Sequence, residues 1–193
     1  MNVVQTALPG VLLLEPVVRS DERGHFCETW NDARYAAAGV ASPFVQDNLS
    51  FSNGGVLRGL HLQWPCAQGK LIHVPFGAVY DVAVDVRVGS PTFGQWVGAV
   101  LDATTMRQMW IPPGFAHGFA VQSAGAVVQY KVTAPYEPSD EITIAWNDPR
   151  IGIEWPIAEP KLSPRDAAAP QLDDVMTRLP RWSRASGLAS DHP

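Results

Sequence analysis

The most constraining feature of the sequence is a strict alternation of side chains in the segment 79–87. Val82, Val84 and Val86 alternate with Asp81, Ala83, Asp85 and Arg87. A period of two is typical of a β-strand whose two faces meet different surroundings. We therefore expect a strand with its valine face buried in a core and its charged face in water.

Several other short runs have the same character, and turn residues separate them. We predict strands at 11–14, 71–74, 95–101, 126–132 and 141–146. Many short strands at close spacing indicate a sandwich or barrel. One short helix is expected at 30–39, with Asn31 or Asp32 as its cap and Gly39 as its stop. We predict one domain over residues 1–180, and a disordered tail over 181–193, where the pattern is lost.

Charge and cysteine content narrow the function. A net charge of -5 argues against binding to nucleic acid or to an anionic membrane. Two cysteines, Cys27 and Cys66, are too few for a disulfide framework, so we expect free thiols in a reducing compartment. The apolar run 11–14 is too short for a signal peptide or a membrane span. The expected location is the cytoplasm.

The stretch Pro112-Pro-Gly-Phe-Ala-His117 matches the second half of the cupin signature, P-x-G-x-x-H. The first half of that signature has a His-x-His pair and a later Glu, which together bind a metal. Here the pair reads His61-Leu-Gln63, no Glu follows at the right spacing, and the cation Lys70 arrives instead. One or two ligands do not hold zinc or iron. We therefore expect a mainly β, cupin-type jelly-roll barrel or sandwich with short helices and no metal.

A more specific resemblance rests on six ordered motifs. They are Arg58-Gly-Leu-His61-Leu-Gln63, Gln68-Gly-Lys70, Pro113-Gly-Phe-Ala-His117-Gly-Phe119, Tyr130-Lys131, Trp146-Asn-Asp-Pro149 and Leu162-Ser-Pro-Arg-Asp166. In this order and spacing the chain, from about Leu13 to about Asp174, resembles the dTDP-4-dehydrorhamnose 3,5-epimerase family. The resemblance implies a dTDP-4-keto-6-deoxy sugar as substrate and inversion at carbons 3 and 5.

The resemblance also implies four catalytic residues. A ketone at carbon 4 acidifies the hydrogens on carbons 3 and 5, so epimerisation needs a base, an acid and an enolate stabiliser, but no cofactor. His61 matches the base, and Asp166 matches the carboxylate that orients it. Tyr130 matches the acid on the opposite face of the sugar, since a phenol is protonated at neutral pH. Lys70 is the expected cation at the carbonyl oxygen.

Ten further positions match substrate contacts of the family. Arg23 and Arg58, together with Lys70, are expected at the diphosphate, and Arg165, where the family often has lysine, is expected at a phosphate on the rim. Phe26 and Tyr136 are expected to stack on the base, or else to be ordinary packing residues. The remaining polar contacts are Glu28, Gln46, Asn48, His117 and Glu141. The resemblance implies a homodimer that exchanges N-terminal strands, so residues near Arg23 serve the neighbouring subunit.

Three alternatives stay open on the sequence. The first is an epimerase that inverts carbon 3 alone, or one that acts on another dTDP-4-keto sugar of antibiotic-sugar synthesis. The second is a metal-dependent cupin oxygenase or isomerase, and the third is a sugar-binding cupin without catalysis. His25 and His73 are given no role, and Asp166 could instead form only a turn or cap.

Overall fold

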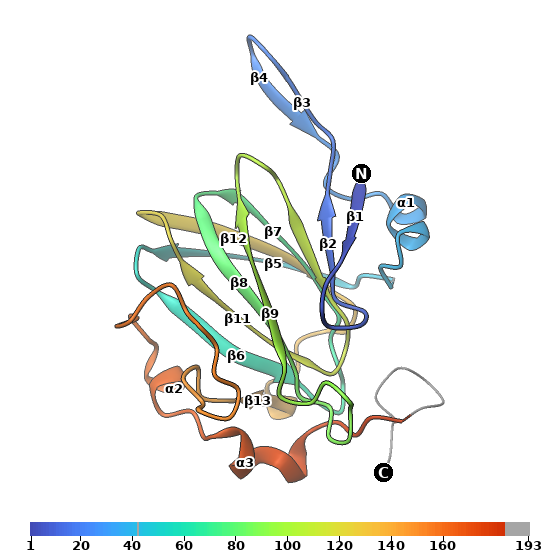
Figure 1. Ribbon diagram of the computed structural model, residues 1–193. Coiled ribbons are helices and arrows are strands. Elements are labelled where there is room, and N and C mark those ends of the chain that lie inside the picture. Colours follow the sequence, from blue (N-terminus) through green and yellow to red (C-terminus); the bar gives the residue numbers. More distant parts are fainter. Residues whose placement is uncertain (42, 184–193) are drawn as a thin grey trace.

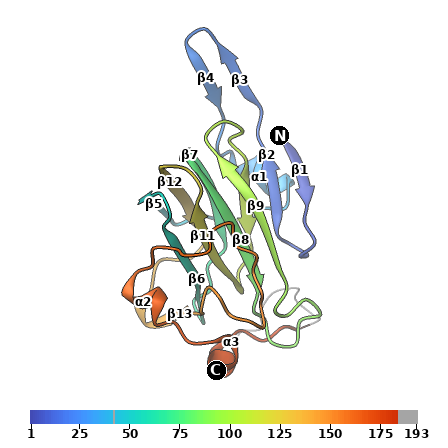
Figure 2. The ribbon, with the colours of Figure 1, turned by 60° about the vertical axis from the view of Figure 1, so that its left-hand side comes forward.

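The computed structural model describes residues 1–41 and 43–183, and it consists of two facing β-sheets (Figures 1 and 2). The six-stranded sheet has the order β1 (Asn2–Gln5), β2 (Leu12–Glu15), β10 (Gln108–Ile111), β7 (Lys70–Phe76), β12 (Gly125–Val132) and β5 (Gln46–Asn53). The five-stranded sheet has the order β13 (Glu141–Thr143), β6 (Leu57–Gln63), β11 (Phe115–Val121), β8 (Ala78–Asp85) and β9 (Trp96–Asp102). The predicted mainly β sandwich is confirmed.

Helices are short and lie outside the sheets. They are α1 (Asp32–Ala37), α2 (Pro164–Ala167), α3 (Leu172–Val175) and the 3₁₀ turns at Pro138–Asp140 and Met176–Arg178. The predicted helix near 30–39 is confirmed as α1: Asn31 caps it by accepting from the Arg34 amide, and Gly39 follows it with φ +90°. None of the helices in the described part of the chain has the length and apolar composition needed to cross a bilayer.

The sandwich has its largest hydrophobic core between the two sheets. Ile72 and Val74 from β7 meet Phe115 and Phe119 from β11 there, all of them buried. A second cluster covers the outer face of the five-stranded sheet, where Val82 and Val84 of β8 pack against Leu172 and Val175 of α3. The segment 151–179 thus closes the outside of this sheet.

This second cluster corrects the expectation for the segment 79–87. The strand itself is confirmed as β8, and its valine face is buried, but the face with Asp81 and Asp85 is not in water. It points between the two sheets, and both aspartates are fully buried. They are kept there by polar partners, since Asp81 contacts His117 and Asp85 contacts Arg87. Sequence alternation located the two faces but wrongly placed the charged face in water, since both faces are buried.

The hairpin β3 (Val18–Asp21) and β4 (Gly24–Cys27) extends away from the sandwich, as Figures 1 and 2 both show. It carries two of the predicted binding residues, Arg23 and Phe26, and Phe26 is 70% exposed. Near the other boundary, Arg181 and Trp182 pair with Val88 beside the five-stranded sheet. The rest of the predicted tail, 184–193, lies outside the described residues, and the boundary at residue 181 stays a prediction.

Candidate active site

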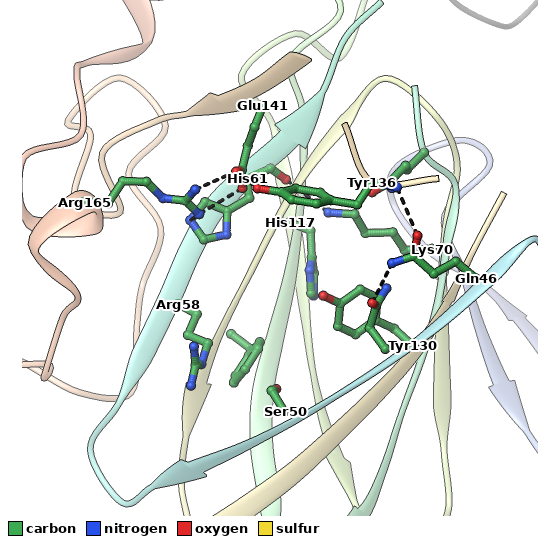
Figure 3. A pocket seen from close by; sticks show the side chains of 13 residues that line it. Gln46, Ser50, Arg58, His61, Lys70, His117, Tyr130, Tyr136, Glu141 and Arg165 are labelled. Atoms are coloured by element: carbon green, nitrogen blue, oxygen red, sulfur yellow. Dashed lines mark hydrogen bonds and ion pairs between the residues drawn. The ribbon is translucent and has the colours of Figure 1, made fainter. Parts of the chain in front are cut away.

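A pocket of about 330 Å³ opens between the two sheets (Figure 3). Three of the four predicted catalytic residues line it: His61 from β6, Lys70 from β7 and Tyr130 from β12. Seven of the ten predicted binding residues line it as well, namely Gln46, Asn48, Arg58, His117, Tyr136, Glu141 and Arg165. The motifs that lie far apart in the sequence therefore meet at one place in the fold.

A β-bulge in β6 explains how Arg58 and His61 both reach this pocket. Residues three apart on a regular strand point to opposite faces. Here His117 pairs with His61 while Phe119 pairs with Arg58, so β6 has one more residue than β11 between the two pairs. The extra residue lies at Gly59, which has φ +126°. The glycine in Arg-Gly-Leu-His thus turns both side chains to the inner face.

Replacing Gly59 with alanine is expected to cost about 4 kcal/mol of stability, since strain at the positive φ adds to a steric clash. A Cβ at this position would lie 2.6 Å from the Cα of Gly118 and 2.9 Å from the carbonyl oxygen of His117. In a chain of this size the loss lowers Tm by roughly 10 °C.

Gly24→Ala is the matched control, because Gly24 has φ +128° but a Cβ added there would have no atom within 4 Å of it. It carries the backbone strain without the clash. Thermal melting of both variants separates the two effects. Equal melting temperatures for Gly59→Ala and Gly24→Ala would show that the close approach of β6 and β11 has no energetic weight.

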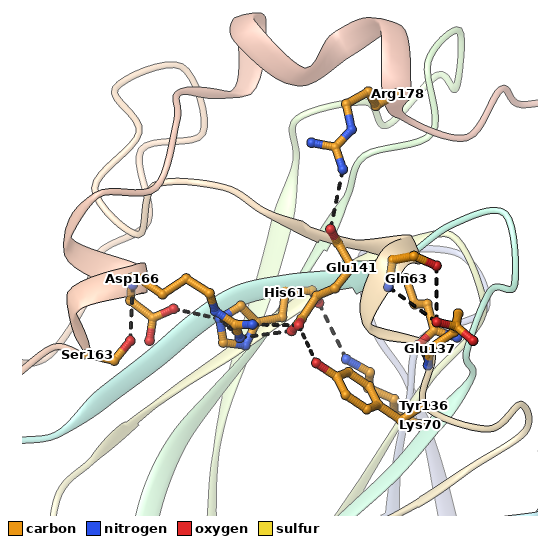
Figure 4. Close-up of polar contacts among 11 residues, drawn as sticks. His61, Gln63, Lys70, Tyr136, Glu137, Glu141, Ser163, Asp166 and Arg178 are labelled. Carbon is orange, nitrogen blue, oxygen red and sulfur yellow. Dashed lines mark hydrogen bonds and ion pairs between the residues drawn. The ribbon is translucent and has the colours of Figure 1, made fainter.

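The base candidate His61 has a short contact to a carboxylate. Its Nε2 lies 2.6 Å from Oδ1 of Asp166, which is 4% exposed on α2 (Figure 4). Ser163 caps α2 by accepting a hydrogen bond from the Asp166 amide. Burial by itself would raise the pKa of the Asp166 carboxyl, but the hydrogen bonds from His61 and Ser163 outweigh it and hold that pKa below its usual value. The carboxylate therefore accepts the Nε2 proton, and the lone pair is left on Nδ1.

Lys70, which is buried, and Tyr130, which is half-buried, lie in the same pocket. Burial lowers the pKa of Lys70 to about 8, although the charges of Glu141 and Asp81 oppose the shift. The Lys70 Nζ lies 3.4 Å from the carbonyl oxygen of His61. Burial, reinforced by the charge of Glu141, raises the pKa of Tyr130. At neutral pH the pocket thus presents a protonated phenol and an ammonium group.

The mouth of the pocket is closed by a polar cluster around Glu141 (Figures 3 and 4). Arg165 binds both oxygens of this carboxylate, at 2.5 and 2.9 Å, and the Tyr136 hydroxyl donates to it at 2.7 Å. Arg165 also lies 3.4 Å from His61 Nε2. A ligand phosphate could replace Glu141 as the partner of Arg165, and a ligand amide N–H could replace Arg165 or Tyr136 as the donor to Glu141.

Gln63, which occupies the place of the second cupin histidine, has a different use here. Its side chain is buried, donates to the carbonyl of Pro135 at 3.0 Å and accepts from the amide of Glu137 at 2.8 Å. These bonds tie β6 to the loop that carries Tyr136. Across residues 1–41 and 43–183, no group of three or more His, Cys, Asp or Glu side chains is arranged to hold a metal ion.

Three predicted binding residues, Arg23, Phe26 and Glu28, do not line this pocket. Arg23 pairs with Asp21 on the hairpin, and Glu28 pairs with Arg34 of α1. Three residues that line the pocket had no predicted role, namely Gln68 and Phe119, which lie within matched motifs, and Ser50. Asp81, which lies beneath the pocket and contacts His117, was also missed. Ser50 continues the alternation of Gln46 and Asn48 along β5, which is the signal that could have revealed it.

Comparison with known proteins decides the family. Residues 5–174 match the model of the family described as dTDP-4-dehydrorhamnose 3,5-epimerase. The enzyme of that name from Salmonella typhimurium is 54% identical over 179 residues, which cover 91% of this chain and 98% of the relative. The chain belongs to this family. It is therefore an epimerase, and the predicted resemblance is confirmed.

Solved structures agree with the fold of this epimerase. The dTDP-6-deoxy-D-glucose-3,5-epimerase of Legionella pneumophila, in complex with dTDP-4-keto-L-rhamnose, superposes with a TM-score of 0.91 at 49% identity, covering 94% of this chain and 98% of that one. ChmJ, a 3'-monoepimerase from Streptomyces bikiniensis in complex with dTDP-quinovose, gives 0.85 at 35% identity over 91% of each chain. The expected cupin-type jelly roll is thus confirmed.

Proposed function

We propose that this epimerase inverts carbons 3 and 5 of dTDP-4-dehydro-6-deoxy-D-glucose to give dTDP-4-dehydro-L-rhamnose. The observation that carries the proposal is the pocket itself, in which an imidazole held by a carboxylate, a half-buried phenol and a buried ammonium surround one cavity. That set supplies a base, an acid and an enolate stabiliser. The names of the Salmonella and Legionella relatives support the substrate.

We assign the two proton transfers of each inversion to His61 and Tyr130. His61 Nδ1 removes the proton from the carbon next to the ketone, and the electron pair moves onto the carbonyl oxygen, where Lys70 stabilises it. Tyr130 then donates its hydroxyl proton to the opposite face of the same carbon. His61 loses its proton to solvent and Tyr130 regains one before the second carbon reacts.

The nucleotide part of the substrate is assigned to the pocket mouth. Arg58 and Arg165 bind the diphosphate, Gln46 and Asn48 bind the sugar and phosphate oxygens, and Tyr136 stacks on the thymine. In this arrangement Glu141 exchanges its present partners for a donor of the ligand. His117 contacts the hexose from the floor of the pocket.

The test is incubation with dTDP-4-keto-6-deoxyglucose in deuterated buffer, followed by NMR at carbons 3 and 5. We expect deuterium and inverted configuration at both carbons. Deuterium at carbon 3 alone would instead support the second candidate, a 3-epimerase. The structural similarity to the monoepimerase ChmJ is the reason to consider this candidate.

We also propose a cytoplasmic homodimer that exchanges its N-terminal hairpins. The hairpin carries Arg23 and Phe26 away from the pocket of its own chain, which supports their use in a neighbour's pocket. On β5, at the edge of the six-stranded sheet, Leu49 and Phe51 are 65% and 55% exposed. Apolar side chains grouped on a sheet edge are suited to burial against a second copy.

Phe51→Glu is expected to shift the protein from dimer to monomer in sedimentation velocity runs, because it places a charge in the proposed apolar contact. Asn53→Glu is the control, since Asn53 is also exposed on β5 but is polar. A parent protein that sediments as a monomer would contradict the proposal outright.

A further inference from the structure

A fully buried carboxylate lies beneath the floor of the active-site pocket. Asp81, on the inner face of β8, is 0% exposed, and its Oδ2 lies 2.9 Å from Nε2 of His117. Its other oxygen, Oδ1, is buried and has no hydrogen-bond partner among the described residues. A carboxylate in this position is costly unless positive charge is close to it. The buried charge of Asp81 therefore requires hydrogen-bond donors or positive charge on the pocket side.

His117 is the first of these groups. It lies 8% exposed in the floor of the pocket, and it is the direct cross-strand partner of the base His61 in the β11–β6 pairing. Figure 3 shows it between His61 and Tyr130. Because Asp81 takes Nε2, Nδ1 is the ring nitrogen left for a ligand. The position of His117 is between the base and the acid, where the hexose must lie.

Lys70 is the second group. It reaches the same floor from the six-stranded sheet, opposite β8, and is 9% exposed. Asp81 and Glu141 are the two carboxylates whose charges favour its protonated form, whereas burial disfavours that form. Glu141 has the larger effect of the two, but its carboxylate is also shared with Arg165 and Tyr136. Asp81, whose Oδ1 has no hydrogen-bond partner among the described residues, adds its charge to the balance of Lys70.

We propose that Asp81 is a positioning residue that holds His117 through Nε2 and keeps Lys70 in its protonated form beside the carbonyl oxygen of the substrate. The inference rests on the proposed epimerase function and adds a buried counter-charge behind the Lys70 cation. The oxygen on carbon 4 takes up the charge in both proton abstractions. The hydrogen-bond donors of the Lys70 ammonium group accelerate the reactions at carbon 3 and carbon 5 alike.

The first test is Asp81→Asn, which keeps the size of the side chain but removes its charge. We expect kcat to fall on the order of 10²-fold, with KM nearly unchanged, because the donors act on charge that develops after binding. Exchange at carbon 3 and at carbon 5 should slow by the same factor. A loss confined to one carbon would overturn the shared-oxygen role.

The pH profile supplies a readout that a merely structural role would not move. The titratable or charged groups around Lys70 are Asp81, Glu141, His61, His117, Tyr130, Tyr136, Arg58 and Arg165. Lys70 acts as a cation, so kcat/KM falls as pH rises through its pKa, near 8 in the parent protein. Without the charge of Asp81 the protonated form is less favoured, so this alkaline limb moves to lower pH. An unmoved limb would overturn the proposal.

Asp148→Asn is the matched control. Asp148 is also buried, at 3% exposed, but it accepts from the amides of Arg150, Ile151 and Leu172 and does not line the pocket. We expect this variant to lose stability while keeping the parent pH profile. Equal pH profiles in the two variants would reduce Asp81 to a packing role.

A measurement on the parent protein covers the case in which Asp81→Asn does not fold. In ¹⁵N-histidine-labelled protein at pH 7.5, with His117→Gln for assignment, Nε2 of His117 should carry a proton, because it donates to Asp81. An unprotonated Nε2 would overturn the positioning of His117 by Asp81. This measurement needs no substrate, so it stays decisive even if the parent protein fails to convert the sugar, which would refute the proposed function alone.

Discussion

Replacing His61 with alanine is expected to lower kcat by up to about 10⁴-fold while dTDP still binds with near-parent affinity. The His61 imidazole combines a free ring nitrogen with a carboxylate that holds the other nitrogen, at 2.6 Å. Without it no group is placed to take the proton from carbon 3 or carbon 5. In deuterated buffer, neither carbon should gain deuterium. Calorimetric titration with dTDP measures the retained affinity, and NMR of the sugar measures the loss of deuterium uptake.

His73→Ala is the control for this experiment. His73 is also a histidine on an inner strand of a sheet, but it lies on the outer face of β7, and burial lowers its pKa. Its removal should leave turnover near the parent value. A His61→Ala protein that still exchanges carbon-bound hydrogen at a near-parent rate would end the role of His61 as base.

Replacing Tyr130 with phenylalanine is expected to separate proton abstraction from inversion. The ring stays, but the hydroxyl that donates the proton is lost, so kcat for inversion should fall on the order of 10²- to 10⁴-fold. His61 can still remove a proton and return one to the same face. Deuterium should therefore enter the sugar with retained configuration, unlike in His61→Ala, where none enters.

Tyr80→Phe serves as the control, because Tyr80 is on the outer side of β8 and packs in the cluster under the segment 151–179. It should retain inversion. If Tyr130→Phe inverts either carbon at the parent rate, the acid is another group. If it loses exchange as completely as His61→Ala, Tyr130 acts in abstraction itself.

The sequence predicted the class of fold and most of the pocket, for identifiable reasons. Short alternating runs located β8, β9 and β12, and ordered motifs located His61, Lys70 and Tyr130. Alternation could not show that the charged face of β8 is buried. Asp81 and Asp85 look like surface residues until their partners His117 and Arg87 are placed. Asp166 was named from family resemblance, since its contact with His61 spans 105 residues.

The bulge in β6 could not be predicted from the sequence for a related reason. Gly59 reads as an ordinary turn or weak strand residue, and its function depends on a neighbour, Gly118, in another strand. Ser50 follows the alternation of Gln46 and Asn48 along β5, but no local pattern shows that this face lines a pocket together with residues of β6 and β11. Local spacing predicts elements, whereas contacts between distant strands decide which side chains share a site.

The cover over the valine face of β8 has a consequence for how activity begins in a new molecule. The same segment that buries this face, 151–179, also brings Asp166 to His61. During synthesis, His61 leaves the ribosome long before its carboxylate, so the sandwich strands precede a competent base. Until the segment 151–179 is in place, His61 therefore lacks the carboxylate that holds its Nε2.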